Sequence, residues 1–172
     1  SELSQHENYS LIKKYPIFMP YLSGIRTPHE YPNIEGSIFG LNLNTNKKNI
    51  AWTIIEGISF IFKECQDILI NNNYKFPKEI VLIGGGAKNI QWAKILSSLL
   101  NVKILVPENQ DYVASIGAIR LAMNNLTMSK YKPIFPESNV IDVDLRLREI
   151  LLERFDRYME HQKLLLNNLK NC

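Results

Sequence analysis

The chain contains few cysteines and no cluster of charge of one sign. Of its 172 residues only two are cysteine, Cys65 in an apolar pattern and Cys172 at the last position. This pair makes neither a disulfide framework nor the spacing of a metal site, and a reducing, cytoplasmic location fits it best. Lys and Arg total 20 against 17 Asp and Glu, and the net charge of +3 is spread along the chain. Without a basic block, we expect no nucleic-acid partner.

Long apolar runs are absent as well. No run approaches the roughly 18 residues that a membrane span needs, and the opening SELSQHENYS is too polar for a signal peptide. We therefore expect no membrane partner. With 45% hydrophobic residues, the chain nevertheless has enough apolar material for the core of about one domain.

Prolines separate a loop-rich first segment from a more regular remainder. Pro16, Pro20, Pro28 and Pro32 lie close together in the sequence and exclude long helices there. We therefore treat residues 1–35 as a loop-rich first segment. The motif GSIFGLNL, which follows it, is typical of a short strand with a glycine at each tight point.

Helix and strand patterns alternate after that segment. Apolar residues at intervals of three or four predict helices, and compact apolar runs predict buried strands. The expected elements are a helix over 45–70, a strand over 79–83 buried on both faces, a helix over 92–100, a strand over 102–106, a helix over 116–126 and a long helix over 143–170. This alternation implies right-handed crossovers and a parallel sheet, with ligands at the carboxyl ends of its strands.

The stretch EIVLIGGGAKNIQW (79–92) places three consecutive glycines at such a strand end. Glycines there allow positive φ and let a ligand touch the backbone, while the amides at the start of the following helix attract an oxyanion. The run fits neither G-x-G-x-x-G, because Asn89 occupies the sixth position, nor the P-loop pattern, because no Lys-Ser or Lys-Thr follows. The pattern alone leaves two interpretations open: a nucleotide or phosphate site, and a tight strand-to-helix turn.

Five motifs taken together resemble successive motifs of the FGGY carbohydrate kinases, and of the xylulose kinases among them most closely. They are FMPYLSGIRTPH (18–29), GSIFGLNL (36–43), IIEGISF (54–60), LIGGGAKNIQW (82–92) and SIGAIRLAM (115–123). Their order and spacing match the family, so the combination is far more specific than any single motif. The family has a glutamate where this chain has Ile25, so the loop around that residue indicates no particular sugar.

The resemblance implies a fold and the part of it that this chain represents. The fold is α/β, a ribonuclease-H-like, actin-like ATPase fold in which two lobes close over ATP and a sugar. Residues 36–126 would form the C-terminal half of the second, nucleotide-binding lobe, and residues 127–172 a linker and the long C-terminal helix. The first lobe, the catalytic aspartate and the phosphate-binding loops of the family would all precede Ser1.

The resemblance also implies where ATP binds. The family residues at six positions lie beside the adenosine or flank the nucleotide, and in this chain these positions are Gly84, Gly85, Gly86, Ala87, Asn89 and Ile90. Mg²⁺ would be bound through the phosphates, mainly by parts of the kinase outside this chain. We expect no catalytic residue and no metal ligand here, because phosphoryl transfer needs an aligned hydroxyl, an orienting carboxylate and Mg²⁺ in one constellation.

Two functions from different classes follow. The first is an ATP-dependent sugar kinase that transfers the γ-phosphoryl group to a sugar hydroxyl, with ATP, ADP and a sugar as partners and this chain on the adenosine side of the cleft. The second is a catalytically inert remnant that serves as a nucleotide-binding or interaction module. In either case the sheet edge beside residues 79–83 would be unpaired, and we expect self-association through it.

Other polar and aromatic residues receive structural interpretations. His29 fits a turn histidine that bonds to backbone, Glu56 fits a structural role more than a place in the cleft, and Gly117 fits close packing of a helix on the sheet. The aromatic residues expected in the core are Trp52, Phe60 and Phe62.

Overall fold

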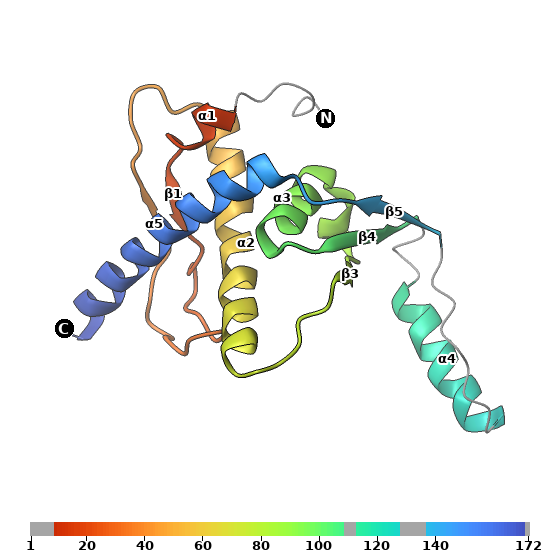
Figure 1. The fold of residues 1–172 in the computed structure, drawn as a ribbon. Coiled ribbons are helices and arrows are strands. Elements are labelled where there is room, and N and C mark those ends of the chain that lie inside the picture. Colours follow the sequence, from red (N-terminus) through yellow and green to blue (C-terminus); the bar gives the residue numbers. More distant parts are fainter. Residues whose placement is uncertain (1–8, 109–112, 128–136, 171–172) are drawn as a thin grey trace.

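The computed structural model describes residues 9–108, 113–127 and 137–170. In chain order its elements are α1 (Tyr9–Ile12), β1 (Ile17–Met19), β2 (Ser37–Phe39), α2 (Lys47–Asn71), β3 (Glu79–Val81), the 3₁₀ helix η1 (Gly85–Lys88), α3 (Ile90–Leu100), β4 (Lys103–Pro107), α4 (Val113–Thr127), β5 (Ser138–Ile141) and α5 (Leu145–Lys170). α2 and α5 cross at the centre of the molecule, and α3 with its strands lies beside them (Figure 1).

The strands form two small sheets. β1 and β2 pair antiparallel, with Ile17 opposite Phe39. In the second sheet β4 is central, because it pairs in parallel with β3 and antiparallel with β5. The parallel β3–β4 pair, joined through α3, confirms the expected crossover. β5 is an addition that the sequence pattern does not predict.

The expectation that the strand over 79–83 is buried on both faces is wrong. Glu79 is exposed, and Ile80 and Val81 are only half-buried. β3 is an edge strand of its sheet, so only β4 adjoins it. β4 is the enclosed strand, with Ile104 and Val106 almost fully buried.

Asparagine side chains define where two helices begin. The Oδ1 atom of Asn46 accepts the backbone N–H groups of Lys48 and Asn49, and the Asn49 side chain accepts the N–H of Asn46 in return. This capping box satisfies donors that would otherwise be unpaired in the first turn of α2. Asn89 caps α3 in a simpler way, since its side chain accepts the N–H of Trp92.

The larger core cluster gathers apolar side chains of β1, α2, α3 and α5 around Phe60. The centre of the Phe60 ring lies 5.5 Å from that of Phe155 and 5.1 Å from that of Tyr158. Trp52 and Phe60 are buried as expected, whereas Phe62 is 46% exposed, so its assignment to the core is wrong. A smaller cluster lies between β4 and α3.

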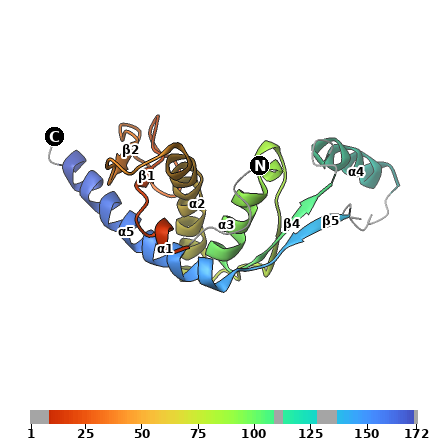
Figure 2. The ribbon, with the colours of Figure 1, turned by 90° about the horizontal axis from the view of Figure 1, so that it is seen from above.

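α4 lies at the outer end of the molecule, beyond the three-stranded sheet (Figure 2). The expected close packing of Gly117 is wrong, because no heavy atom lies within 4 Å of the position that its Cβ would take. Ile119 and Leu121 are exposed on this helix. Even so, no helix in the described part of the chain combines the length and the apolar character that crossing a bilayer requires.

A buried ion pair connects α2 and α5. Arg154 of α5 donates from Nε to Oε1 of Glu56 over 2.7 Å and from Nη2 to Oε2 over 2.5 Å, and both side chains are almost completely buried. The same guanidinium donates to the carbonyl oxygens of Ile12, Tyr15 and Pro16 over 2.8–2.9 Å. The structural role expected for Glu56 is therefore confirmed.

Replacement of Arg154 by methionine tests how much this pair stabilises the fold. The Arg154→Met change would leave the Glu56 carboxylate buried with the Trp52 indole N–H as its one remaining side-chain donor among the described residues, and such an uncompensated charge costs about 3–5 kcal/mol of unfolding free energy. Urea denaturation followed by circular dichroism measures the loss. Arg146→Met, on the exposed start of the same helix, should change stability by less than about 0.5 kcal/mol. Equal effects of the two changes would contradict the assignment.

Candidate functional site

The glycine loop directly follows β3. Gly84 has φ +87°, a conformation that residues with a Cβ rarely adopt. The chain then turns into η1, where the N–H of Ala87 donates to the carbonyl of Gly84 over 3.1 Å and the N–H of Asn89 to that of Gly86 over 3.0 Å. β3, η1 and α3 therefore follow one another with almost no intervening loop.

The three glycines have two kinds of surroundings. At Gly84 and Gly85 no heavy atom lies within 4 Å of the position of a Cβ, so the backbone there borders open space. At Gly86 a Cβ would lie 2.0 Å from a ring carbon of Trp92. The glycine run was expected to let a ligand touch the backbone. At Gly86 the Trp92 indole occupies the space of a side chain, so the missing Cβ there makes room for that ring.

Five of the six predicted site residues are exposed on this loop: Gly84, Gly85, Gly86, Asn89 and Ile90. Ala87 is fully buried in the smaller core cluster, so its side chain supports the loop from beneath. Ile83 and Ile90 are 48% and 45% exposed at the two ends of the glycine run. The loop thus presents bare backbone between two apolar side chains.

Trp92 anchors the loop to α2, a role that sequence reasoning missed. Its indole Nε1 donates to the hydroxyl of Ser59 over 3.0 Å, and its ring meets the Phe62 ring edge-on at 6.2 Å. The available signal was an aromatic residue six positions after the last glycine of the run. That spacing does not reveal which way the indole points.

Bare backbone flanked by isoleucines fits a flat heteroaromatic group such as adenine, which would make van der Waals contacts and backbone hydrogen bonds there. The described residues contain no group of three or more His, Cys, Asp or Glu side chains placed to hold a metal ion. None of the six predicted site residues has a titratable side chain that could take part in proton transfer.

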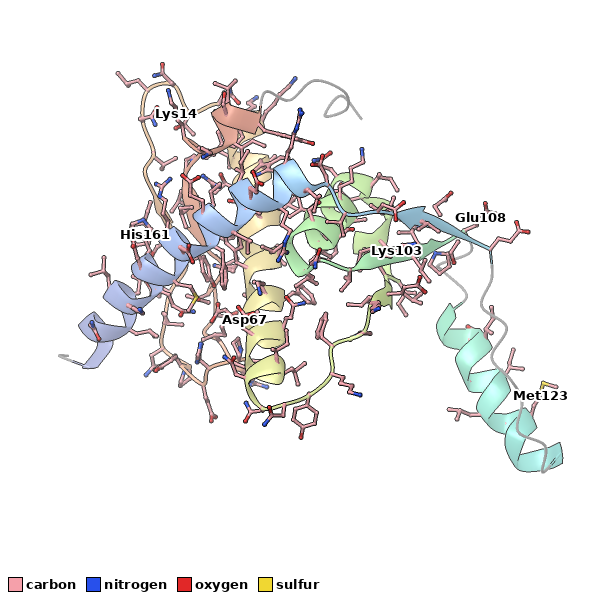
Figure 3. All side chains as sticks on the ribbon, viewed as in Figure 1. Lys14, Asp67, Lys103, Glu108, Met123 and His161 are labelled. Atoms are coloured by element: carbon pink, nitrogen blue, oxygen red, sulfur yellow. The ribbon has the colours of Figure 1, made fainter. Side chains whose placement is uncertain are left out.

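Two carboxylates of α2 that could be considered as a catalytic base are held in ion pairs. Glu56 is committed to Arg154. Asp67 pairs with Lys63 one turn earlier on α2, and Figure 3 shows it on the lower half of that helix. Asp111, a third carboxylate with a conceivable role as base, lies outside the described residues.

In the loop over residues 22–34, His29 bonds to a side chain and not to backbone as expected. His29 Nε2 lies 2.9 Å from Oε2 of the buried Glu64, which also accepts a hydrogen bond from Gln162. Ile25, which replaces the glutamate of the family, is buried and pairs with Tyr31 through both backbone groups. The loop therefore keeps a defined shape without that glutamate.

Gln162 also donates to the Tyr21 hydroxyl, which lies 2.6 Å from the hydroxyl of Tyr158. Burial raises the pKa of both tyrosines above the usual value, so both phenols stay protonated at neutral pH. This network connects α2, α5 and the segment after β1. Oε1 of Glu64 is a buried atom of this network for which no hydrogen-bond partner is found among the described residues.

The C-terminal domain of the FGGY family of carbohydrate kinases matches residues 3–126 of this chain. A xylulose kinase from Escherichia coli (strain K12) is 30% identical over 147 residues, which make up 84% of this chain and 28% of that protein. A xylulose kinase from Staphylococcus xylosus is 38% identical over 107 residues, or 62% of this chain and 22% of that protein.

Solved structures agree with these sequence matches. A xyloylose kinase from Brucella ovis superposes with a TM-score of 0.81 at 28% identity, over 89% of this chain and 32% of that chain. A ligand-bound xylulose kinase from Lactobacillus acidophilus gives a TM-score of 0.77 at 28% identity, over 88% of this chain and 31% of that chain. The fold is thus that of FGGY sugar kinases, and the chain spans less than a third of the length of these relatives.

The different surroundings of the glycines predict different costs of adding a methyl group. Gly86→Ala would push the Trp92 indole out of place and break its bond to Ser59, so we expect a loss of about 1–3 kcal/mol of unfolding free energy. Gly85→Ala adds the same methyl group into open space and should change stability by less than about 0.5 kcal/mol. Thermal unfolding of both variants measures the difference. A Gly86→Ala variant as stable as Gly85→Ala would show that Trp92 does not fix the loop.

Proposed function

Because the chain belongs to the FGGY family of carbohydrate kinases, we propose that it supplies the adenosine side of the nucleotide cleft in an ATP-dependent sugar kinase. Such an enzyme transfers the γ-phosphoryl group of ATP to a sugar hydroxyl. The observation that carries the proposal is the open backbone at Gly84 and Gly85, at the carboxyl end of a parallel strand, where α/β proteins generally place ligands.

Each loop residue has a role in this proposal. The peptide groups of Gly84 and Gly85 contact the adenosine, and Ile83 and Ile90 enclose it from two sides. Asn89 holds the start of α3 through its bond to Trp92, and Ala87 supports the turn from within the core. ATP provides the transferable phosphoryl group and Mg²⁺ shields its phosphates, mainly through parts of the kinase outside this chain.

The proposal also covers the sugar acceptor and the cellular location. The relatives named above are xylulose kinases, which makes a pentulose the first acceptor to test. Nothing in the loop around Ile25 selects one sugar over another. We place the protein in the cytoplasm, where ATP is at hand and reducing conditions keep Cys65 as the free thiol that it is here.

The alternative function is an inert nucleotide-binding or interaction module, and the paired state of Glu56 and Asp67 favours it for the chain in isolation. Both proposals share one expectation. Mixed alone with Mg-ATP and pentuloses, the 172-residue chain should release no ADP in a sugar-dependent manner, because neither an aligned sugar hydroxyl nor an orienting carboxylate is provided.

A nucleotide titration tests the adenosine site. Gly85→Val would fill the open space beside the loop without touching Trp92, so we expect affinity for a non-hydrolysable ATP analogue to fall by about tenfold, or about 1.4 kcal/mol. Isothermal titration calorimetry measures this change, and adenosine as a second titrant shows that the base and ribose are the parts affected. Asn71→Val, at the exposed far end of α2, is the control. Unchanged affinity in a folded Gly85→Val variant would contradict the proposed adenosine site.

The free edge of β3 supports a further part of the proposal, which is that the chain self-associates. Backbone bonds from Lys103 to Lys78 and from Leu82 to Leu105 show that even-numbered residues face β4. In a parallel ladder the alternate residues then direct their N–H and C=O groups to the opposite side. Within the described part of the chain, Glu79 and Val81 therefore present unpaired backbone groups, next to the exposed Ile83.

Sedimentation velocity tests this self-association. We expect dimers or larger assemblies of the 172-residue chain at concentrations of about 0.1 mM, a range in which weak edge pairing is measurable. Val81→Pro removes an outward N–H without deleting a β3–β4 bond, so this variant should sediment as a monomer. A wild-type chain that stays a compact monomer at high concentration would contradict the proposal.

A further inference from the structure

A buried hydroxyl group connects α2 to α3 near the glycine loop. Ser59 of α2 is completely buried, and its Oγ makes two hydrogen bonds. It donates to the carbonyl of Ile55 one turn earlier over 2.8 Å, and it accepts the indole Nε1–H of Trp92 over 3.0 Å. Because the hydroxyl hydrogen is used within α2, the oxygen can only accept from α3, and an indole N–H can only donate. The two side chains therefore match in polarity.

The Trp92 indole is held along two opposite edges. Nε1, on one edge, bonds to Ser59. Cζ3 and Cε3, on the other edge, lie 2.0 and 2.8 Å from the position that a Cβ on Gly86 would take. The ring thus fills the space between the Ser59 hydroxyl and the backbone of the loop. Because the indole is rigid, a hydrogen bond at one edge also fixes the other edge, where the ring meets Gly86.

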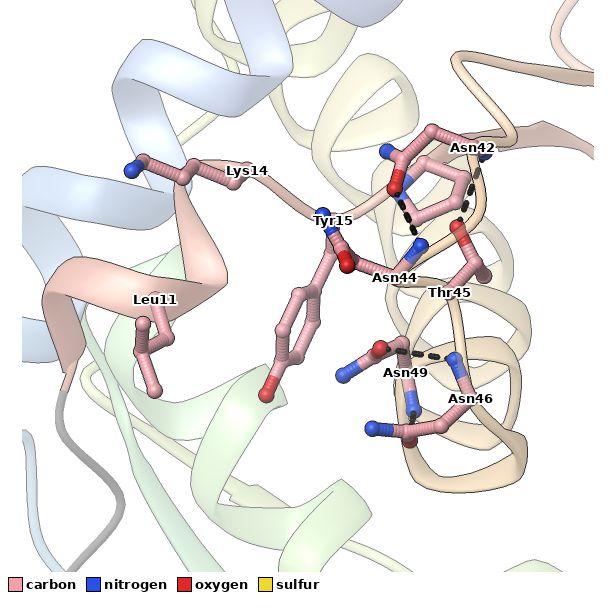
Figure 4. A pocket seen from close by; sticks show the side chains of 9 residues that line it. Leu11, Lys14, Tyr15, Asn42, Asn44, Thr45, Asn46 and Asn49 are labelled. Carbon is pink, nitrogen blue, oxygen red and sulfur yellow. Dashed lines mark hydrogen bonds between the residues drawn. The ribbon is translucent and has the colours of Figure 1, made fainter.

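α2 provides a fixed frame for this contact. Its first turn is closed by the capping box of Asn46 and Asn49, which Figure 4 shows at the edge of a hollow beside α1. Further along, the Thr53 hydroxyl donates to a carbonyl of the turn before β1 over 3.1 Å. Phe60, the neighbour of Ser59, is completely buried in the larger core cluster. The position of the Ser59 hydroxyl is therefore set by the core and not by the loop.

Loss of the hydroxyl would reach the loop through the ring. Trp92 is only half-buried, so an indole N–H deprived of its acceptor would turn toward water, the alternative that costs least. Its opposite edge would then leave Gly86. The carbonyl of Gly86 accepts the N–H of Asn89 over 3.0 Å in η1, and residues 84–85 directly precede it in the chain. A displaced indole therefore releases the backbone that borders the open space of the loop.

We propose that Ser59 is a positioning residue for the nucleotide site. Through the Trp92 indole it fixes the backbone at Gly84 and Gly85, which would contact the adenosine. Because Ser59 is completely buried, it acts through Trp92 and not by contact with the nucleotide. The effect on nucleotide affinity rests on the proposed function, whereas the effect on the loop can be measured without any nucleotide.

Amide hydrogen exchange of the 172-residue chain, followed by NMR, tests the effect on the loop. In Ser59→Ala we expect the amides of Ala87 and Asn89 to exchange about three to ten times faster than in the wild type, the usual consequence of losing one neutral hydrogen bond. Affinity for a non-hydrolysable ATP analogue, measured by calorimetry, should fall by a similar factor. Ser97→Ala is the matched control, because Ser97 is also completely buried and its hydroxyl bonds to carbonyls outside the loop. It should change both quantities by less than about twofold.

A double-mutant cycle shows whether Ser59 acts through the indole. Trp92→Phe removes the N–H that Ser59 accepts, so adding Ser59→Ala to this variant should cause no further loss of affinity and no faster exchange. Tryptophan fluorescence gives a separate readout. In Ser59→Ala the emission maximum should move to longer wavelength as Trp92 turns toward water, while Trp52, which is 1% exposed, keeps its surroundings.

The proposal would be overturned by a folded Ser59→Ala variant whose loop exchanges at the wild-type rate. Equal effects of Ser97→Ala would overturn it too, as would an undiminished effect of Ser59→Ala in the Trp92→Phe background. A wild-type chain that binds no ATP analogue, combined with faster loop exchange in Ser59→Ala alone, would contradict the proposed adenosine site and support the positioning role of Ser59. The two failures are thereby distinguished.

Discussion

The position of β1 relative to the two long helices depends on one buried guanidinium. Arg154 can be buried because two carboxylate oxygens and four carbonyl oxygens accept its donors, which offsets a desolvation cost of several kcal/mol. The carbonyls come from the end of α1 and the turn before β1, the carboxylate from α2 and the guanidinium from α5. Pro16 O accepts a second bond from Thr53 of α2, so the entrance to β1 is fixed from both helices.

Charged residues on the surface of α5 also bind backbone carbonyls or opposite charges on other parts of the chain. Arg148 donates to the carbonyls of Ser98 and Leu99 in the last turn of α3, where a cation is favoured by the helix dipole. Glu153 pairs with Lys13, and Arg157 donates to the Lys13 carbonyl. The surface charges of α5 thereby attach it to two other parts of the chain, the end of α3 and Lys13 after α1.

Periodicity was enough to predict α2, α3, α5 and the parallel β3–β4 pair, because burial of one face imposes the apolar spacing that the sequence displays. It failed for β5, whose four residues Ser138–Ile141 carry no clear alternation and pair with β4 only through tertiary structure. The exposure of β3 was not predicted for a related reason. Apolar residues indicate a strand, but they do not show how many other strands pair with it. At the site, the glycine run was visible from sequence, whereas the separate reasons for its glycines depend on where Trp92 packs.

The contact between Gly86 and Trp92 makes the residue allowed at each of these positions depend on the other. The indole fills the volume that any larger residue at 86 would claim, and it also bonds to Ser59 of α2. A change at 86 alone would meet the ring, and a smaller residue at 92 alone would leave a void under the loop. Substitutions at these two positions should therefore arise together or not at all among related chains, independently of what the loop binds.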